Sequence, residues 1–123
     1  MNTTVLVVED DRDSRELLGE MLELSGYRPL LAADGLEALR LLGRERPCVI
    51  LLDLMMPRMD GCAFRQAQLA VEALRAIPVV VVSADPNAER KARDIEAAAC
   101  LGKPVDPDDV LALVQQYCEQ PRA

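Results

Sequence analysis

The chain has 123 residues, which is enough to bury one hydrophobic core and predicts a single domain. Its formal net charge of −7, from 14 basic and 21 acidic residues, argues against a nucleic-acid surface, which needs clustered positive charge, and the sequence has no basic run. No stretch approaches the ~20 apolar residues of a membrane span, and the N-terminus lacks the pattern of a signal peptide. We therefore expect a cytoplasmic protein that contacts neither nucleic acid nor a membrane directly.

Two units, each an apolar run followed by a helical segment, open the chain. The apolar run at 4–8 precedes a helical segment that a Ser-Gly pair at 25–26 ends. A second apolar run at 28–32 precedes a helix that begins at Asp34, with Glu37 three residues later as in a capping box. The first helix is predicted from apolar residues that recur every three or four positions: Leu17, Leu18, Met21, Leu22 and Leu24.

Three further units continue the alternation. In the last helix, Asp106 is predicted to cap the first turn and Pro107 to occupy the first helical position. The buried face of that helix is predicted from Val110, Leu113, Val114 and Tyr117. The apolar runs lie at 49–52, 79–82 and 100–102, and the helical segments at about 61–76, at about 86–98 and from 106 onward.

Alternation of strands and helices five times over predicts a parallel sheet with helices on both faces. The runs at 4–8, 49–52 and 79–82 are wholly apolar, as expected for central strands. Pro29 places the second run at one edge, and the short fifth run suits the other edge. The predicted fold is a single doubly wound (βα)5 α/β domain with the flavodoxin-like strand order 2-1-3-4-5.

Polar and charged side chains follow four of the predicted strands. The first is followed by the acidic triplet Glu9-Asp10-Asp11, the third by Asp53, the fourth by Ser83 and the fifth by Lys103. Because the carboxyl ends of parallel strands meet at one edge of a sheet, we expect these groups to lie together at the point where the strand order reverses.

Such a cluster of carboxylates needs a cation or a proton. At ~5 Å and an effective dielectric constant of about 20, two carboxylates repel by roughly 3 kcal/mol. Oxygen ligands that are few and open to water suit Mg²⁺, which often shares its coordination with phosphate. An aspartate can also act as a nucleophile and form an aspartyl phosphate. Ser83 could then donate a hydrogen bond to the phosphoryl group, and Lys103 could supply a positive charge.

The chain resembles a response-regulator receiver domain of two-component signalling from Thr4 to about Tyr117. Each matching motif is weak alone, but together they occur in the family's order and at the expected strand ends. They are Val7-Val8-Glu9-Asp10-Asp11, the segment from Asp53 to Gly61 (DLMMPRMDG), Val82-Ser83-Ala84 and Lys103-Pro104.

The resemblance implies a role for each matching residue. Asp53 would accept phosphate from the phosphohistidine of a histidine kinase or a histidine phosphotransfer protein. Glu9, Asp10, Asp53 and the backbone carbonyl of Met55 would bind Mg²⁺, whereas Asp11 falls one place beyond the metal-binding pair. Ser83 would be the switch hydroxyl, and Lys103 the lysine beside the phosphate. The resemblance further implies a cis Lys103–Pro104 bond and a small residue, here Ala84, that keeps the phosphate pocket open.

Two positions depart from the family. Cys100 stands where the family usually has a tyrosine or phenylalanine that swings inward on activation, and Val105 stands where an aromatic residue is common. Cys100 keeps a second function open, a receiver-like interaction module that acts without phosphate. An aspartyl-phosphate hydrolase fits poorly, since such enzymes resemble one another in an acid two residues after the nucleophile, where this chain has Met55. A nucleotide-binding role also fits poorly, because the glycines form no phosphate-binding pattern.

Further expectations concern the cysteines and the extent of the protein. Cys48, Cys62, Cys100 and Cys118 have no metal-ligand spacing and are predicted to be small buried hydrophobes in a reducing cytosol. Residues 1–123 are predicted to form one receiver domain with no output domain, either a stand-alone regulator or part of a larger protein. We expect a signalling domain, not an enzyme, which catalyses its own phosphotransfer and slow autodephosphorylation. It would be a monomer or weak dimer, and its downstream partner is left open.

Overall fold

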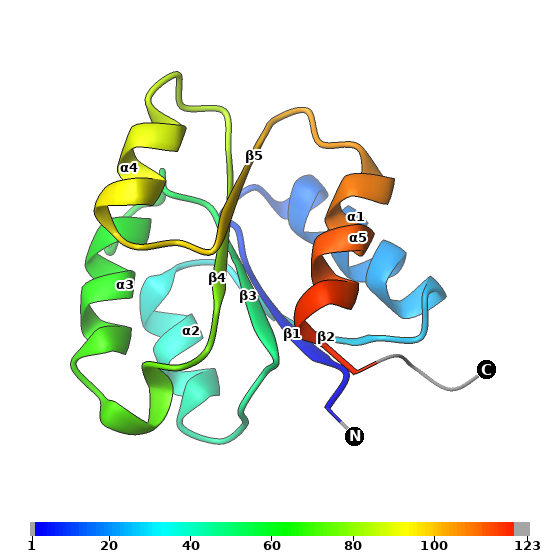
Figure 1. The fold of residues 1–123 in the computed structure, drawn as a ribbon, viewed down its shortest axis with the longest axis horizontal. Helices are drawn as coiled ribbons and strands as arrows, with labels where there is room; N and C mark the ends of the chain where they lie inside the picture. The colour runs from blue at the N-terminus through cyan, green and yellow to red at the C-terminus, as the bar shows by residue number, and fades with distance from the viewer. Residues whose placement is uncertain (1, 120–123) are drawn as a thin grey trace.

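The computed structural model describes residues 2–119 and contains a parallel sheet covered by helices on both faces (Figure 1). The predicted end of the domain at Ala123 lies outside the described residues. The predicted (βα)5 α/β fold is confirmed. The elements are β1 (Thr4–Val8), α1 (Arg12–Leu24), β2 (Arg28–Ala32), α2 (Gly35–Leu42), β3 (Val49–Leu52), α3 (Gly61–Leu69), the short 3-10 helix η1 (Glu72–Leu74), β4 (Val79–Ser83), α4 (Ala88–Asp94), β5 (Ala99–Gly102) and α5 (Pro107–Tyr117).

The strand order is β2-β1-β3-β4-β5, and every neighbouring pair is parallel. All residues of β3 and β4 are buried, while β2 and β5 at the two edges are partly open. Burial on both faces explains why the central strands are wholly apolar. The predicted order is therefore confirmed, and the carboxyl ends of β1 and β3 lie at the topological switch point.

The helices form two layers. α1 and α5 cover one face of the sheet, and α2, α3 and α4 cover the other (Figure 1). Both layers are packed mainly with aliphatic side chains, as the shortage of aromatic residues requires. Phe64 lies in the layer of α2, α3 and α4, whereas Tyr27 and Tyr117 pack in the layer of α1 and α5.

Aspartates cap α1, α2, α3 and α5, whereas α4 begins after Asn87 without a side-chain cap. The side chains of Asp11, Asp34, Asp60 and Asp106 each accept a hydrogen bond from a backbone N–H in the first turn of a helix. Each side chain satisfies a donor that the helix itself leaves unpaired. The caps predicted at Asp34 and Asp106 are confirmed, as is Pro107 at the start of α5.

Several helix details differ from the predictions. α3 ends at Leu69 and not near residue 76, because the chain turns there and brings the carbonyls of Leu74 and Ile77 to the Gln68 amide, which donates to both. α4 stops at Asp94, and Glu96 adopts a left-handed backbone (φ 55°) that ends the helix. No helix at 2–119 is long and apolar enough to cross a membrane.

The apolar stripe of α1 is narrower than predicted. Leu18 and Leu22 are buried against the sheet, but Leu17 is 68% exposed and Leu24 is 89% exposed. Leu18 and Leu22 are four residues apart and share one helix face, whereas Leu17 and Leu24 lie beside that face. In α5, Val110 and Val114 are buried, while Leu113 and Tyr117 are partly buried.

The prediction of four unpaired cysteines was wrong for two of them. Cys48 and Cys118 form a disulfide, although 70 residues separate them in sequence. Cys48 directly precedes β3 and Cys118 directly follows α5, so the fold brings their Cα atoms to 5.2 Å. Cys62 and Cys100 are free and partly buried.

Candidate functional site

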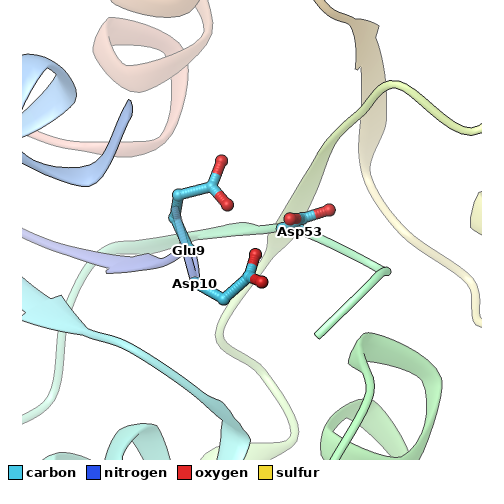
Figure 2. Close-up of side chains that lie close together, drawn as sticks. All are labelled: Glu9, Asp10 and Asp53. Atoms are coloured by element: carbon cyan, nitrogen blue, oxygen red, sulfur yellow. The ribbon is translucent and has the colours of Figure 1, made fainter. Parts of the chain in front are cut away.

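Carboxylates from the ends of β1 and β3 lie together at the carboxyl edge of the sheet. Glu9, Asp10 and Asp53 each offer an oxygen atom, and these oxygens lie within 4.8 Å of one another. Figure 2 shows the three carboxylates around a common space. Glu9 and Asp53 are 2% and 6% exposed, whereas Asp10 is open to solvent. The predicted meeting of these strand ends is confirmed.

Backbone hydrogen bonds extend the sheet pairing into this cluster. The N–H of Glu9 donates to the carbonyl of Ala32 (3.0 Å), and the N–H of Asp53 donates to the carbonyl of Val8 (2.9 Å). Both acidic residues are therefore held by the last rungs of the sheet. Glu9 and Asp53 therefore form the ordered, buried side of the cluster, and Asp10 forms the side that is open to solvent.

Lys103 reaches the cluster from the end of β5. Its ammonium donates a hydrogen bond to Oε1 of Glu9, and its Nζ lies 3.7 Å from Oδ2 of Asp53. The backbone N–H of Lys103 donates to the carbonyl of Ser83 (3.0 Å), which aligns the lysine with β4. The Lys103–Pro104 peptide bond is cis, as the resemblance implied.

The charges of the cluster are unbalanced. Three ionised carboxylates and one ammonium sum to −2. Burial raises the pKa of Glu9, and the neighbouring Asp53 raises it further, while Lys103 opposes both effects. Burial alone would lower the pKa of Lys103, but its hydrogen bond to Glu9 and the charge of Asp53 raise it overall. A divalent cation would bring the sum to zero, and oxygen donors are the ligands that Mg²⁺ prefers.

Ser83 ends β4 beside this edge and is buried. Its Oγ accepts a hydrogen bond from the N–H of Asp85 (3.1 Å), so its hydroxyl hydrogen stays available to donate. The Asp85 carboxylate accepts a hydrogen bond from Lys91 of α4, which ties the loop after β4 to the following helix. Ala84 lines a groove together with Lys103.

The loop after β3 brings a backbone group to Asp53. The N–H of Met55 donates to Oδ1 of Asp53 (3.1 Å), while the Met55 side chain is exposed. Gly61 closes this loop against Asp53, because a Cβ at Gly61 would lie 2.7 Å from the Asp53 carbonyl oxygen. Arg58 in the same loop adopts a left-handed backbone (φ 63°). The loop therefore has little freedom beside the carboxylate.

Sequence reasoning missed two side chains that support the loops around the site. Arg15 of α1 donates from Nη1 to the carbonyls of Glu9 (2.9 Å) and Asp10 (3.2 Å). Arg58 donates to Asp34, which joins the loop after β3 to the loop after β2. The position of Arg15, one turn into the helix after the acidic triplet, was a weak signal for its contact. Arg58 gave no such signal, because its partner lies 24 residues away.

An apolar groove of about 500 Å³ adjoins the cluster. Its polar lining residues are Glu9, Ser14 and Lys103. The exposed Leu17 lines it, which gives this side chain a surface role that helical periodicity did not indicate. The other apolar residues of its wall come from α1, from β4 and from the segment around the cis bond: Leu18, Met21, Val82, Pro104, Val105 and Pro107.

Comparison with known proteins agrees with this geometry. The family described as response regulator receiver domain matches residues 5–115. The chain is 37% identical over 115 residues to response regulator MprA of Mycobacterium ulcerans, covering 91% of this chain and 48% of MprA. It is 29% identical over 117 residues to sporulation initiation phosphotransferase F of Bacillus subtilis, covering 95% and 94% of the two chains.

A solved structure of a receiver domain shares this fold. The receiver domain of sensor histidine kinase PA1611 from Pseudomonas aeruginosa has a TM-score of 0.87 and 27% identity, covering 95% of this chain and 98% of that chain. That structure has a magnesium ion coordinated in its active-site cleft. This chain belongs to the response regulator receiver domain family, the receivers of two-component systems. It spans about half the length of MprA.

Proposed function

We propose that this domain accepts a phosphoryl group on Asp53 from the phosphohistidine of a histidine kinase or a histidine phosphotransfer protein, in a reaction that requires Mg²⁺. The observation that carries the proposal is the cluster of Glu9, Asp10 and Asp53, with their oxygens within 4.8 Å of one another and Lys103 beside them. A phosphoryl switch needs a nucleophile, a cation site and a positive side chain together, and this edge of the sheet supplies all three.

The residues present fit a magnesium ion. Carboxylates of Glu9, Asp10 and Asp53 would hold it with the backbone carbonyl of Met55, and water would fill the remaining positions. When bound, Mg²⁺ offsets the negative charge that the phosphoryl oxygens bring to the acidic site. The ligands are hard oxygen atoms, and the site is open to solvent on the Asp10 side. Both properties suit a magnesium ion that also binds a phosphoryl oxygen.

The side chains divide the work of the transfer. An Asp53 oxygen forms a bond to phosphorus as the bond between phosphorus and the histidine nitrogen breaks, and that nitrogen keeps the electron pair. Lys103, 3.7 Å from Asp53, supplies positive charge to the phosphoryl oxygens. Ser83 donates its hydroxyl hydrogen to the phosphoryl group, since its Oγ already accepts from the Asp85 N–H. Arg15 holds the carbonyls of Glu9 and Asp10 in place.

The proposal also includes how the phosphoryl group is lost and where the domain acts. Water would attack the phosphoryl group on Asp53 slowly, so the domain would return to its resting state without a second enzyme. We propose that the domain acts in the cytoplasm as a monomer or weak dimer and contacts neither nucleic acid nor a membrane directly. The similarity to sporulation initiation phosphotransferase F supports a partner that carries phosphohistidine.

A phosphate-affinity gel tests the proposal. The purified chain is treated with acetyl phosphate in the presence of Mg²⁺ or of EDTA. A retarded band is expected only with Mg²⁺, because the phosphorylated cluster lacks sufficient positive charge without it. Absence of a retarded band, together with absence of Mg²⁺ binding, would contradict the proposal and favour the phosphate-independent interaction module. A band of equal strength in EDTA would contradict the metal requirement.

Asp10→Asn should weaken Mg²⁺ binding by at least about tenfold, because even ligand-supporting groups contribute that much to metal affinity. The change removes one carboxylate from the cluster and leaves the buried Glu9 and Asp53 in place. Isothermal titration with MgCl₂ measures the Kd. Asp13→Asn is the matched control, since it removes an exposed acid in the first turn of α1 and should leave Kd within twofold. Equal affinities for the two variants would remove Asp10 from the ligand set.

Activation should move the loop after β4 more than α5. Ser83 is hydrogen-bonded to Asp85, and Asp85 to Lys91, so a shift of Ser83 toward phosphate pulls on this loop. Cys100 cannot replace the swing of a large aromatic ring. In NMR spectra recorded with Mg²⁺ and beryllofluoride, the largest amide shifts are expected at 84–91, and Ser83→Ala should reduce them. Full-sized shifts in α4 and α5 together would show that the missing aromatic ring does not matter.

A further inference from the structure

The Cys48–Cys118 disulfide lies at the end of the sheet opposite to the acidic cluster. Cys48 stands at the start of β3, where its N–H donates to the Thr4 carbonyl (2.9 Å) at the start of β1. Cys118 directly follows the last residue of α5 as its C-cap. Figure 1 shows α5 running from the cluster end of the sheet back to the amino ends of β1 and β3. The disulfide therefore fixes the far end of α5 to a central strand.

Apart from the partly buried Tyr117, the other described contacts at this end of α5 are exposed hydrogen bonds. The N–H of Glu119 donates to the Asn2 carbonyl (3.2 Å), and the N–H of Asn2 donates to the Glu119 carboxylate (2.7 Å). Hydrogen bonds open to water contribute little net stability. Deep packing of α5 comes from Val114 and Val110, about one and two turns before its end. The covalent bond is therefore the strongest attachment of the last turn.

Both oxidation states of the pair fit this environment. Sγ of Cys48 lies 3.0 Å from the Thr4 carbonyl oxygen, so a reduced Cys48 thiol has an acceptor for its hydrogen. Cys118 is 7% exposed and packs with the apolar residues beneath α5, where a reduced thiol behaves as a small hydrophobe. Reduction would therefore open the loop of the chain without leaving an unpaired buried polar group.

The two cysteine residues differ in exposure. Cys48 is partly exposed, and the nearby Arg44 and Arg46 are exposed, although Pro47 directly before Cys48 is buried. Cys118 is shielded by its burial. Thiol–disulfide exchange starts at the sulfur that a reagent can reach, so Cys48 is the point of entry. Cys48 and Cys118 are bonded and differ in exposure, and their surroundings accommodate both the disulfide and the two thiols. This arrangement suits a disulfide that forms and breaks reversibly.

We propose that Cys48 and Cys118 form a reversible thiol–disulfide pair that sets how firmly α5 is held to the sheet. In the oxidising direction, the Cys48 thiolate attacks a low-molecular-weight disulfide and releases one thiol. The Cys118 thiolate then attacks Sγ of Cys48 and releases the second thiol. Two protein thiols lose two electrons and two protons, and the reagent disulfide gains them. Oxidation and reduction of this pair are separate from phosphorylation of Asp53.

The experiment uses the full chain in buffers of reduced and oxidised glutathione. Thiols are alkylated and counted by mass spectrometry, and amide hydrogen exchange and Tm are measured in parallel. With alkylation done in denaturant, so that the buried Cys118 is also reached, the oxidised protein is expected to show two alkylated thiols and the reduced protein four. Because the disulfide closes a long loop, reduction should lower Tm by on the order of 10 °C. Hydrogen exchange should accelerate in the last turn of α5, and oxidised glutathione should restore the protection.

Matched variants locate the effect. Cys48→Ser and Cys118→Ala should each remove the response of Tm to glutathione, whereas Cys62→Ser and Cys100→Ser should retain it, since these cysteines are free. If a variant fails to fold, the exchange data on the natural chain still decide. Four reactive thiols in oxidised glutathione would overturn the proposal. So would a bond that resists reduction in the folded protein, or reduction that changes neither Tm nor exchange in α5.

Discussion

The Asp53→Asn variant is expected to take up no phosphate from acetyl phosphate while keeping the fold. Asparagine has nearly the same shape as aspartate, but its amide is no nucleophile for phosphorus. The change also removes a negative charge beside the buried Glu9, whose pKa the Asp53 carboxyl helps to raise. Without Mg²⁺, the variant should therefore unfold at or above the urea concentration that unfolds the natural chain.

The phosphate-affinity gel and a urea unfolding curve measure these two effects on the same samples. Asp13→Asn serves as the control, because it makes the same charge change at an exposed position of α1. It should be phosphorylated as fast as the natural chain. An undiminished phosphate signal in the Asp53 variant would show that another residue is the acceptor. Loss of signal with a lowered unfolding midpoint would instead point to a folding defect.

Arg65→Met should lower the free energy of unfolding by roughly 3 kcal/mol. The Arg65 guanidinium is buried between α3 and the end of α4. It donates to the carbonyls of Ile95 (3.0 Å) and Glu96 (3.1 Å) and to Oε1 of Gln68 (2.9 Å). Methionine fills much of the same volume, but it leaves these buried acceptors without a donor.

Urea unfolding followed by circular dichroism measures the loss. Arg90→Met is the matched control, since Arg90 lies exposed on α4 and the change removes the same charge. It should change stability by no more than about 0.5 kcal/mol. Similar losses in the two variants would show that charge, and not the buried hydrogen bonds, accounts for the effect. The m-value should stay constant if only stability changes.

Much of the architecture followed from patterns that are local in sequence. The strand order was predicted from Pro29 in one apolar run and from the absence of polar residues in three other runs. A central strand is buried on both faces, so its residues do not alternate between apolar and polar. The same order brought Glu9, Asp10 and Asp53 to one edge. Helix ends were less predictable: the end of α3 depends on the contact of Gln68 with Leu74 and Ile77.

Contacts between residues far apart in sequence account for the remaining differences. Cys48 and Cys118 carry no spacing signal, and their pairing depends on where α5 ends relative to the start of β3. Arg15 donates to two backbone carbonyls, and because every residue has such a carbonyl, no sequence pattern marks these two as its partners. The Asp34–Arg58 pair joins the loop after β2 to the loop after β3. The distance between these loops depends on the position of β1 between the two strands.

The uneven placement of the aromatic residues has a practical consequence for optical experiments. The chain has two tyrosines and no tryptophan, and Tyr27 and Tyr117 both belong to the layer of α1 and α5. Tyrosine emission and near-ultraviolet circular dichroism of the natural protein therefore report on that layer, while α2, α3 and α4 contribute only through Phe64. A tryptophan introduced at an exposed position of α4 would give the other layer a signal of its own, so that each side of the sheet could be followed separately.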